Sequence, residues 1–382
     1  MTKKLIIFCD GTWNEPTQHR TNVLKMLQAT EFTDKKGEPQ IVHYIAGIGT
    51  RKGESFRGGV FGLGISENII HAYSFIMSNY EPCDEIFLFG FSRGAFTARS
   101  IAGLIHNVGV LKRHNLPLVA EAYAHYKVKA PGWKPKGAEA VKFREENCHP
   151  WPANIKFLGV WDTVGALGAP YGMMTGYLFD KIFKTSFHNV ELSESVGSAY
   201  HALAADERRW LFRPAPVALT TYHRDRNQAN LEQFGFPLYA QKWFPGVHSN
   251  VGGGYDRHGL SDIALEWMAE NARRNGLNIK PLEEVQLAPG RGFQKDLTEP
   301  AENSQTFYYQ LAALLVKIPS LLGLPPVYPT ADRPLTKHIT WGGNYVRPID
   351  AGEDMSLLDE KKAIDPNYKG SPLNGARDSS SH

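Results

Sequence analysis

The sequence predicts an α/β fold in which a mostly parallel sheet is covered by helices on both faces. Three short apolar runs, each followed by a turn, predict strands in the first ninety residues: 5–9, 41–45 and 85–89. Helical patterns separate or follow them, at 22–27, 65–77 and 92–105. Strands that alternate with helices are typical of parallel sheets, because a parallel connection needs a crossover segment.

The same pattern continues toward the C-terminus. Further strands are predicted at 155–161, 217–222 and 238–244, and further helices at 118–126, 200–211 and 261–274. We expect one α/β domain over 1–275, with surface insertions at about 112–152 and 163–200. A helical or lid extension at 276–350 should pack on it, and 351–382 should form a disordered tail. An apolar segment at 307–324 fits either a core helix or a lid that meets lipid.

Composition excludes several classes of protein. The 382 residues are 42% hydrophobic and 21% charged, with a formal net charge of +3 and no polybasic block, so nucleic acid is not an expected partner. The three cysteines show neither a disulfide framework nor metal-ligand spacing, and no metal or cofactor is expected. The first apolar run ends at Asp10, too early for a signal peptide, and no run reaches the roughly 18 residues of a membrane helix. We therefore expect a soluble, cytoplasmic protein.

Ser92 is the first candidate for chemistry. It lies in Gly90-Phe91-Ser92-Arg93-Gly94, directly after the strand at 85–89 and before a helical stretch. A strand, a sharp turn and a helix are what a nucleophile elbow requires, and glycines tolerate the close backbone approach there. The pentapeptide alone is a weak signal, and a serine that caps a helix is the alternative. With this context, the motif favours an α/β-hydrolase-like fold with Ser92 as nucleophile and Gly90 and Gly94 in support.

Asp162 and His248 are the expected partners of Ser92. Each follows a predicted strand, and the order Ser, Asp, His along the chain is that of α/β-hydrolases. Since the carboxyl ends of parallel strands meet at one edge, the three side chains should converge. A turn-capping aspartate and a loop histidine are the alternatives. The rival acids are Asp206, Asp225 and Asp256.

Asp10-Gly11-Thr12 forms a further turn after a strand. The backbone N–H of Gly11 or Thr12, together with that of Arg93, could form an oxyanion hole. Asp10 is expected to hold this turn by hydrogen bonds. A metal-dependent hydrolase that uses Asp10 with Asp162 and His248 is a weaker alternative.

Four motifs resemble those of the Tle1-like family, the DUF2235 group of α/β-hydrolases named for bacterial type VI secretion phospholipase effectors. They begin at Phe8 (FCDGTWN), Phe89 (FGFSRGAFTAR), Gly159 (GVWDTVG) and Pro245 (PGVHSNVGGGY), and His201–Arg209 (HALAADERR) is similar to a fifth, whose helix should buttress the site. The resemblance spans about residues 4–275 and implies a Ser-Asp-His triad on Ser92, Asp162 and His248. Asn250 departs from the family, which usually has Asp there.

The resemblance implies a serine esterase or lipase that acts on lipid or phospholipid acyl esters, with peripheral contact to membrane lipid. For a secreted effector it further implies export by type VI secretion and a partner immunity protein. An acyltransferase or amidase that uses the same triad, or a non-catalytic lipid-binding module with the same fold, are the alternatives.

Overall fold

The described part of the chain is built around a parallel sheet. The computed structural model describes residues 2–11, 20–47, 60–164, 192–207, 209, 212, 214–285, 292–304, 354–365 and 368. Six strands pair in the order β2-β1-β3-β4-β5-β6, all parallel. Their bounds are Lys4–Cys9 (β1), Gln40–Ile45 (β2), Glu85–Phe91 (β3), Ile155–Trp161 (β4), Ala199–Ala204 (β5) and Tyr239–Phe244 (β6). The predicted α/β fold with a parallel sheet is confirmed.

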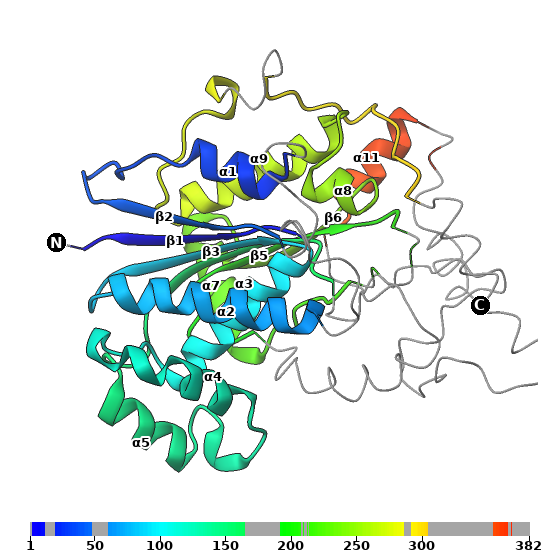
Figure 1. The fold of residues 1–382 in the computed structure, drawn as a ribbon. Coiled ribbons are helices and arrows are strands. Elements are labelled where there is room, and N and C mark those ends of the chain that lie inside the picture. Colours follow the sequence, from blue (N-terminus) through cyan, green and yellow to red (C-terminus); the bar gives the residue numbers. More distant parts are fainter. Residues whose placement is uncertain are drawn as a thin grey trace, which may run out of the picture.

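Helices cover both faces of this sheet (Figure 1). The helices α1 (Asn22–Ala29) and α9 (Gly259–Arg274) pack on one face, and α2 (Val60–Asn79) and α3 (Arg93–Val108) pack on the other. Strand residues alternate between the two layers, because successive side chains of a strand point to opposite faces. On β1, for example, Ile7 belongs to the α2–α3 layer and Phe8 to the α1–α9 layer.

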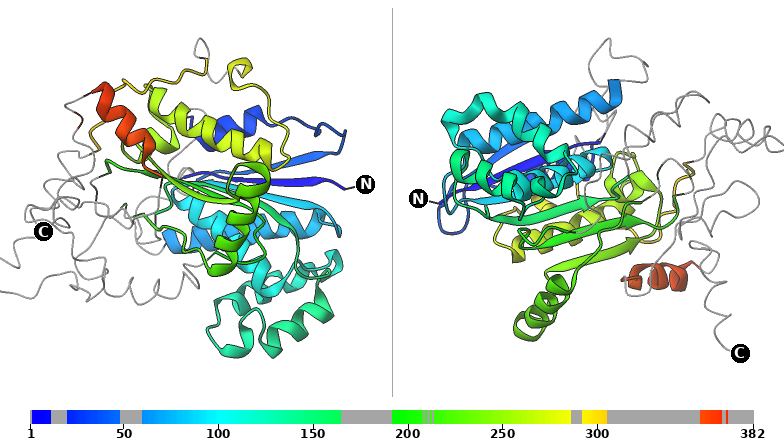
Figure 2. Two further views of the ribbon diagram at one scale, coloured as in Figure 1. Left: turned by 180° about the vertical axis from the view of Figure 1, so that it is seen from behind. Right: turned by 90° about the horizontal axis from the view of Figure 1, so that it is seen from below.

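Shorter elements complete the fold, and Figures 1 and 2 show α4 and α5 outside the α2–α3 layer. Within the described ranges, the remaining α-helices are α4 (Val119–Lys127), α5 (Ala138–Asn147), α7 (Thr221–Phe234), α8 (His248–Gly252) and α11 (Ser356–Ile364). The described 3-10 helices are η1 (Arg113–Leu118), η2 (Pro131–Trp133) and η4 (Leu282–Glu284). Among the described helices, none is both long and apolar enough to cross a membrane.

Two predicted elements between β4 and β6 are wrong. Within the helix expected at 200–211, residues up to 204 instead belong to strand β5, because they pair with both β4 and β6 and tertiary pairing overrides the helix propensity of the alanines. The strand expected at 217–222 does not form. Helix α7 begins at Thr221, and the Thr220 side chain and His223 form a reciprocal capping box at its start.

The two expected surface or disordered regions are more ordered than predicted. The 112–152 insertion contains α5 as well as α4, and Phe143 and Cys148 from it are buried in the core. The tail expected from Ala351 onward contains α11, whose Leu358 packs against the sheet. The apolar segment at 307–324 and most of the 163–200 insertion lie outside the described residues.

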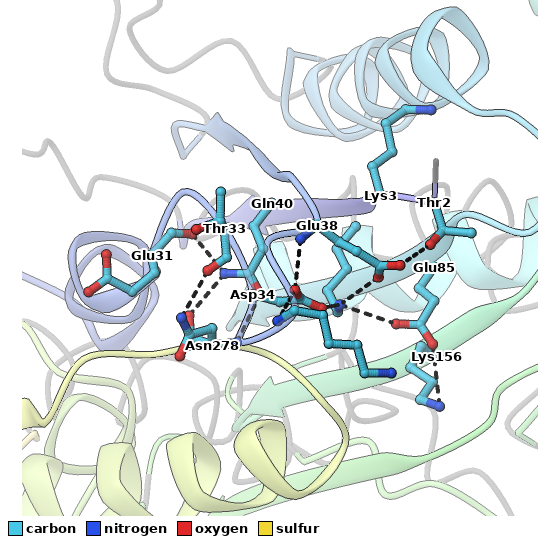
Figure 3. A network of polar contacts seen from close by, with 12 residues as sticks. Thr2, Lys3, Glu31, Thr33, Asp34, Glu38, Gln40, Glu85, Lys156 and Asn278 are labelled. Carbon is cyan, nitrogen blue, oxygen red and sulfur yellow. Dashed lines mark hydrogen bonds and ion pairs between the residues drawn. The ribbon is translucent and has the colours of Figure 1, made fainter.

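A group of ion pairs lies at the amino ends of the central strands (Figure 3). Lys4 of β1 is buried, and its Nζ lies 2.5 Å from Asp34, 3.7 Å from Glu38 and 3.8 Å from Glu85. Its hydrogen bond to Asp34 lowers the pKa of that carboxyl to about 2. Lys156 of β4 pairs with Glu85 at 3.4 Å. These contacts tie the loop before β2 to the start of the sheet, at the end opposite Ser92.

The position of Gly94 predicts that a larger residue there destabilises the fold. A Cβ on Gly94 would lie 2.1 Å from the carbonyl oxygen of Cys9, so α3 could not approach β1 as it does. We expect Gly94→Ala to lower the free energy of unfolding by about 1–3 kcal/mol or more, although alanine favours helix. Thermal and urea unfolding measure this change. Gly292→Ala, where a Cβ meets nothing within 4 Å, is the matched control; equal unfolding of both variants would contradict the account.

Candidate active site

Ser92 occupies a strained turn at the carboxyl end of β3. Its φ of 58° and ψ of −119° are rare for a residue with a side chain, and α3 begins at the next residue. A Cβ on Gly90 would lie 2.4 Å from the carbonyl oxygen of Gly94, so glycine is required for this tight connection. The strand, strained serine and helix have the geometry of the predicted nucleophile elbow.

Asp162 lies at the end of the adjacent strand, β4. It also has a positive φ, 38°, and its side chain is fully buried. The Ser92 N–H donates to the carbonyl of Trp161 at 3.1 Å, so the two strained residues lie at neighbouring strand ends. Asp162 Oδ1 accepts the N–H of Ala204 of β5 at 3.0 Å. This bond leaves Oδ2 to another partner.

That partner is His248, the first residue of α8 after β6. The distance from His248 Nδ1 to Asp162 Oδ2 is 2.6 Å, short enough for a charge-assisted hydrogen bond. An ionised carboxylate accepts only, so Nδ1 carries the proton and Nε2 can act as a base. The rings of Phe91 and Phe212 lie 4.5 and 4.8 Å from the imidazole ring. Since Phe91 directly precedes Ser92, this packing brings α8 to the elbow.

The glycine run behind His248 permits this approach. A Cβ on Gly252 would lie 1.9 Å from the Phe91 ring, and one on Gly253 would lie 2.8 Å from the backbone nitrogen of Asn22. Gly253 also has a φ of 82°. Phe91 and the backbone at Asn22 are thus the close contacts that require glycine here.

Burial lowers the pKa of His248, and the hydrogen bond and charge of Asp162 oppose this shift. Arg209 lowers the pKa further and Glu207 raises it. Because the pKa lies below the ordinary value of 6.5, the imidazole is neutral at neutral pH. A neutral imidazole can act as a general base.

His201 and Gln241 support Asp162 and were not predicted individually. His201 Nε2 accepts the N–H of Thr163 at 3.1 Å, and its Nδ1 lies 3.2 Å from Gln241 Oε1. Gln241 is in turn held by the N–H and carbonyl of Val217. His201 therefore holds the backbone directly after Asp162. The motif at 201–209 does buttress the site, but as a strand and loop instead of a helix.

Glu207 is a second buried carboxylate beside His248. Its Oε2 accepts the His248 N–H at 3.2 Å, and Arg209 donates to both of its oxygens at 2.8–2.9 Å. Ser304 Oγ donates to Oε1 at 3.0 Å. The motif at 201–209 was the available sequence signal for Glu207, but nothing in the sequence predicted that Ser304 reaches it from 97 residues away.

The Asp10 turn has the contacts expected of a structural aspartate. Its carboxylate accepts hydrogen bonds from the Gly11 N–H at 2.6 Å, Thr21 Oγ1 at 2.6 Å and Tyr44 Oη at 2.8 Å. The Gly11 N–H, one predicted oxyanion donor, is thus engaged by Asp10. Thr12 lies outside the described residues.

Asn250 contacts backbone and not the His248 ring. Its Oδ1 accepts the N–H groups of Val247 at 3.1 Å and Glu302 at 3.0 Å. The first bond caps α8 in front of His248. An aspartate could accept the same two bonds, so the departure at this position preserves the local geometry.

The rival acids lie elsewhere. Asp206 accepts the Gly246 N–H at 2.6 Å, Asp225 is on α7, and Asp256 lies between α8 and α9. Asp262, which also follows His248 in the chain, pairs with buried Lys25 at 2.6 Å. Among the described residues, no three His, Cys, Asp or Glu side chains are grouped as a metal site would need. The grouping of Asp10 with Asp162 and His248 is therefore absent from the described part of the chain.

Comparison with known proteins places the chain in a family. The family described as "T6SS, Phospholipase effector Tle1-like, catalytic domain" matches residues 3–271, a range that includes Ser92, Asp162 and His248. The chain belongs to this family, as its motifs indicated.

Individual relatives are more distant. An uncharacterized protein of Saccharomyces cerevisiae is 30% identical over 232 residues, which are 55% of this chain and 32% of that protein. The chain thus spans about a third of this relative. The structure of the Tle1 effector bound to the VgrG spike of the type 6 secretion system has 15% identity and a TM-score of 0.45, over 87% of this chain and 82% of that one. An uncharacterized protein from Pseudomonas aeruginosa has 18% identity and a TM-score of 0.38, over 73% of this chain and 47% of that one.

Proposed function

We propose that this protein is a serine hydrolase that cleaves carboxylic esters through an acyl-enzyme. The observation that carries the proposal is the 2.6 Å bond between His248 and buried Asp162, at the strand end next to the strained Ser92. Membership of a family described as phospholipase effector-like supports a lipase-like hydrolase. Asp10 accepts hydrogen bonds from one backbone N–H and two hydroxyls, Asn250 accepts two backbone N–H groups, and neither is assigned a part in the chemistry.

Each residue has a defined step in the proposed reaction. His248 Nε2 takes the proton from Ser92 Oγ as this oxygen attacks the ester carbonyl, and Asp162 stabilises the resulting imidazolium. The imidazolium then returns the proton to the leaving alcohol, and an acyl-enzyme remains. Water repeats the sequence and releases the acid, and Ser92 recovers its proton.

The oxyanion would form at the N-terminus of α3. The backbone N–H of Arg93 is the first expected donor, and the partial positive charge of the helix end adds to it. For the second donor we favour Thr12, because the Gly11 N–H donates to Asp10.

Lipid or phospholipid acyl esters are the proposed substrates, and the family description supports them. Peripheral contact with membrane lipid would follow from such a substrate. Export by type VI secretion and a partner immunity protein stay predictions for this chain.

Ser92→Ala should abolish turnover of p-nitrophenyl esters and of phospholipids in mixed micelles, because no nucleophile remains. The thermal melt should stay nearly unchanged, since alanine loses only the hydroxyl. Steady-state kinetics on purified protein measure the effect, with Ser195→Ala as the matched control. Turnover in Ser92→Ala equal to that of the wild type would rule out the proposed nucleophile.

The lowered pKa of His248 predicts the pH profile. Only neutral His248 accepts the proton, so the acid limb of kcat/KM should have its midpoint below 6.5. The unfolded chain binds this proton more tightly than the folded one, so the contribution of His248 to stability should fall as pH drops below about 6.5. Rates and thermal melts over one pH series separate the two effects. A midpoint above 6.5 in folded protein would contradict the assignment.

A further inference from the structure

The last described part of the chain lies against the strand that leads to His248, although the family match ends at residue 271. We call residues 354–365 and 368 the C-terminal strap. The strap begins beside β6, where the Trp243 N–H donates to the Asp354 carbonyl at 3.0 Å and Lys242 pairs with the Asp354 carboxylate at 2.9 Å. Leu358 of α11 then packs with Trp243 in a small apolar cluster. Figures 1 and 2 show α11 at the same end of the sheet as α8.

One contact of the strap reaches the turn in front of His248. Tyr368 Oη donates to Asp206 Oδ2 at 2.7 Å, and the same oxygen accepts the Gly246 N–H at 2.6 Å. Gly246 has a φ of 106° and precedes His248 by two residues. Burial and the charge of Asp206 raise the pKa of Tyr368, so its hydroxyl stays a donor. Tyr368 thus fixes the carboxylate that shapes this turn.

A second contact comes from Lys361, a lysine that is only 1% exposed. Its Nζ donates to the carbonyl oxygens of Leu297 at 2.7 Å and Glu299 at 2.8 Å. A buried ammonium that lost these acceptors would be strongly disfavoured, so the lysine fixes the backbone at 297–299. Glu299 Oε2 in turn accepts the N–H of Leu260, at the start of α9.

The segment fixed by Lys361 runs on to residues 302–304, which contact α8 and its neighbour Glu207. The Glu302 N–H donates to Asn250, and the Ser304 hydroxyl donates to Glu207. Glu207 accepts the backbone N–H of His248 itself. Residues beyond the family match therefore hold His248 from both sides, through Gly246 before it and through Asn250 after it.

We propose that the C-terminal strap is a positioning element of the active site, which holds the His248 backbone so that its imidazole meets Asp162. This inference rests on the proposed function. It means that the family-matched residues 3–271 do not complete the site by themselves. Displacement of a catalytic group by about 1 Å can cost a rate factor of about 10², so a support of this kind should be visible in kinetics.

Tyr368→Phe and Lys361→Met in the full-length chain test the proposal. Each removes the polar contact and keeps most of the side chain. Tyr222→Phe on α7 and Lys142→Met on α5 make the same chemical changes at more exposed side chains that contact Arg226 and Glu146 instead of this network, and they serve as controls. We expect kcat to fall roughly tenfold in each strap variant with KM nearly unchanged, since the substrate still binds. Amide hydrogen exchange in the peptide 244–252 should become faster in the strap variants alone.

Wild-type kcat and wild-type exchange in both strap variants would overturn the proposal. If Lys361→Met fails to fold, Tyr368→Phe decides, because it loses a single hydroxyl. If the wild-type protein shows no ester turnover at all, the proposed function fails and the exchange measurement still decides on the strap. In that case, faster amide exchange of peptide 244–252 in the strap variants supports the proposal that the strap holds the His248 backbone. Unchanged exchange overturns it.

Discussion

The hydrogen bond between Asp162 and His248 is the interaction around which this end of the molecule is arranged. It joins residues 86 positions apart, both buried, across the carboxyl ends of β4 and β6. A buried carboxylate without a partner would be costly, so the histidine and the Ala204 N–H together satisfy both oxygens of Asp162. In return, the carboxylate fixes the imidazole tautomer and leaves Nε2 as the base. His201 and Gln241 hold the backbone after Asp162, and Glu207 holds the backbone N–H of His248.

Backbone strain is concentrated at the same edge of the sheet. Ser92 and Asp162 are two of the three described non-glycine residues with positive φ, and they end adjacent strands. Such conformations cost about 1–3 kcal/mol each and persist only where the surroundings impose them. Here the surroundings are the parallel ladder, the contact of α3 with β1 at Gly94, and the hydrogen bond from Thr163 to His201. The strain therefore depends on a rigid sheet.

The main residues of the candidate site could be selected from the sequence, because strand ends are readable from local patterns. Ser92 and Asp162 closely follow apolar runs, His248 follows one after the turn at 245–247, and the order Ser, Asp, His along the chain is that of α/β-hydrolases. Strand β5 was missed because an alanine-rich segment reads as helix when its two neighbouring strands are unknown. The supports from Glu207, Ser304 and Tyr368 could not be predicted, since they join segments that are distant in sequence and have no periodic signal. Helix α11 was hidden for a similar reason, because its burial depends on one small cluster with Trp243.

The central claim is that Asp162 activates Ser92 through His248. The most direct test is the rate at which a fluorophosphonate probe modifies Ser92 in the wild type and in Asp162→Asn, with the modified residue identified by tandem mass spectrometry. We expect an adduct on Ser92 in the wild type and a rate more than about a hundredfold lower in Asp162→Asn, because the amide no longer fixes the base. Equal rates in the two proteins, or an adduct on another serine, would contradict the account.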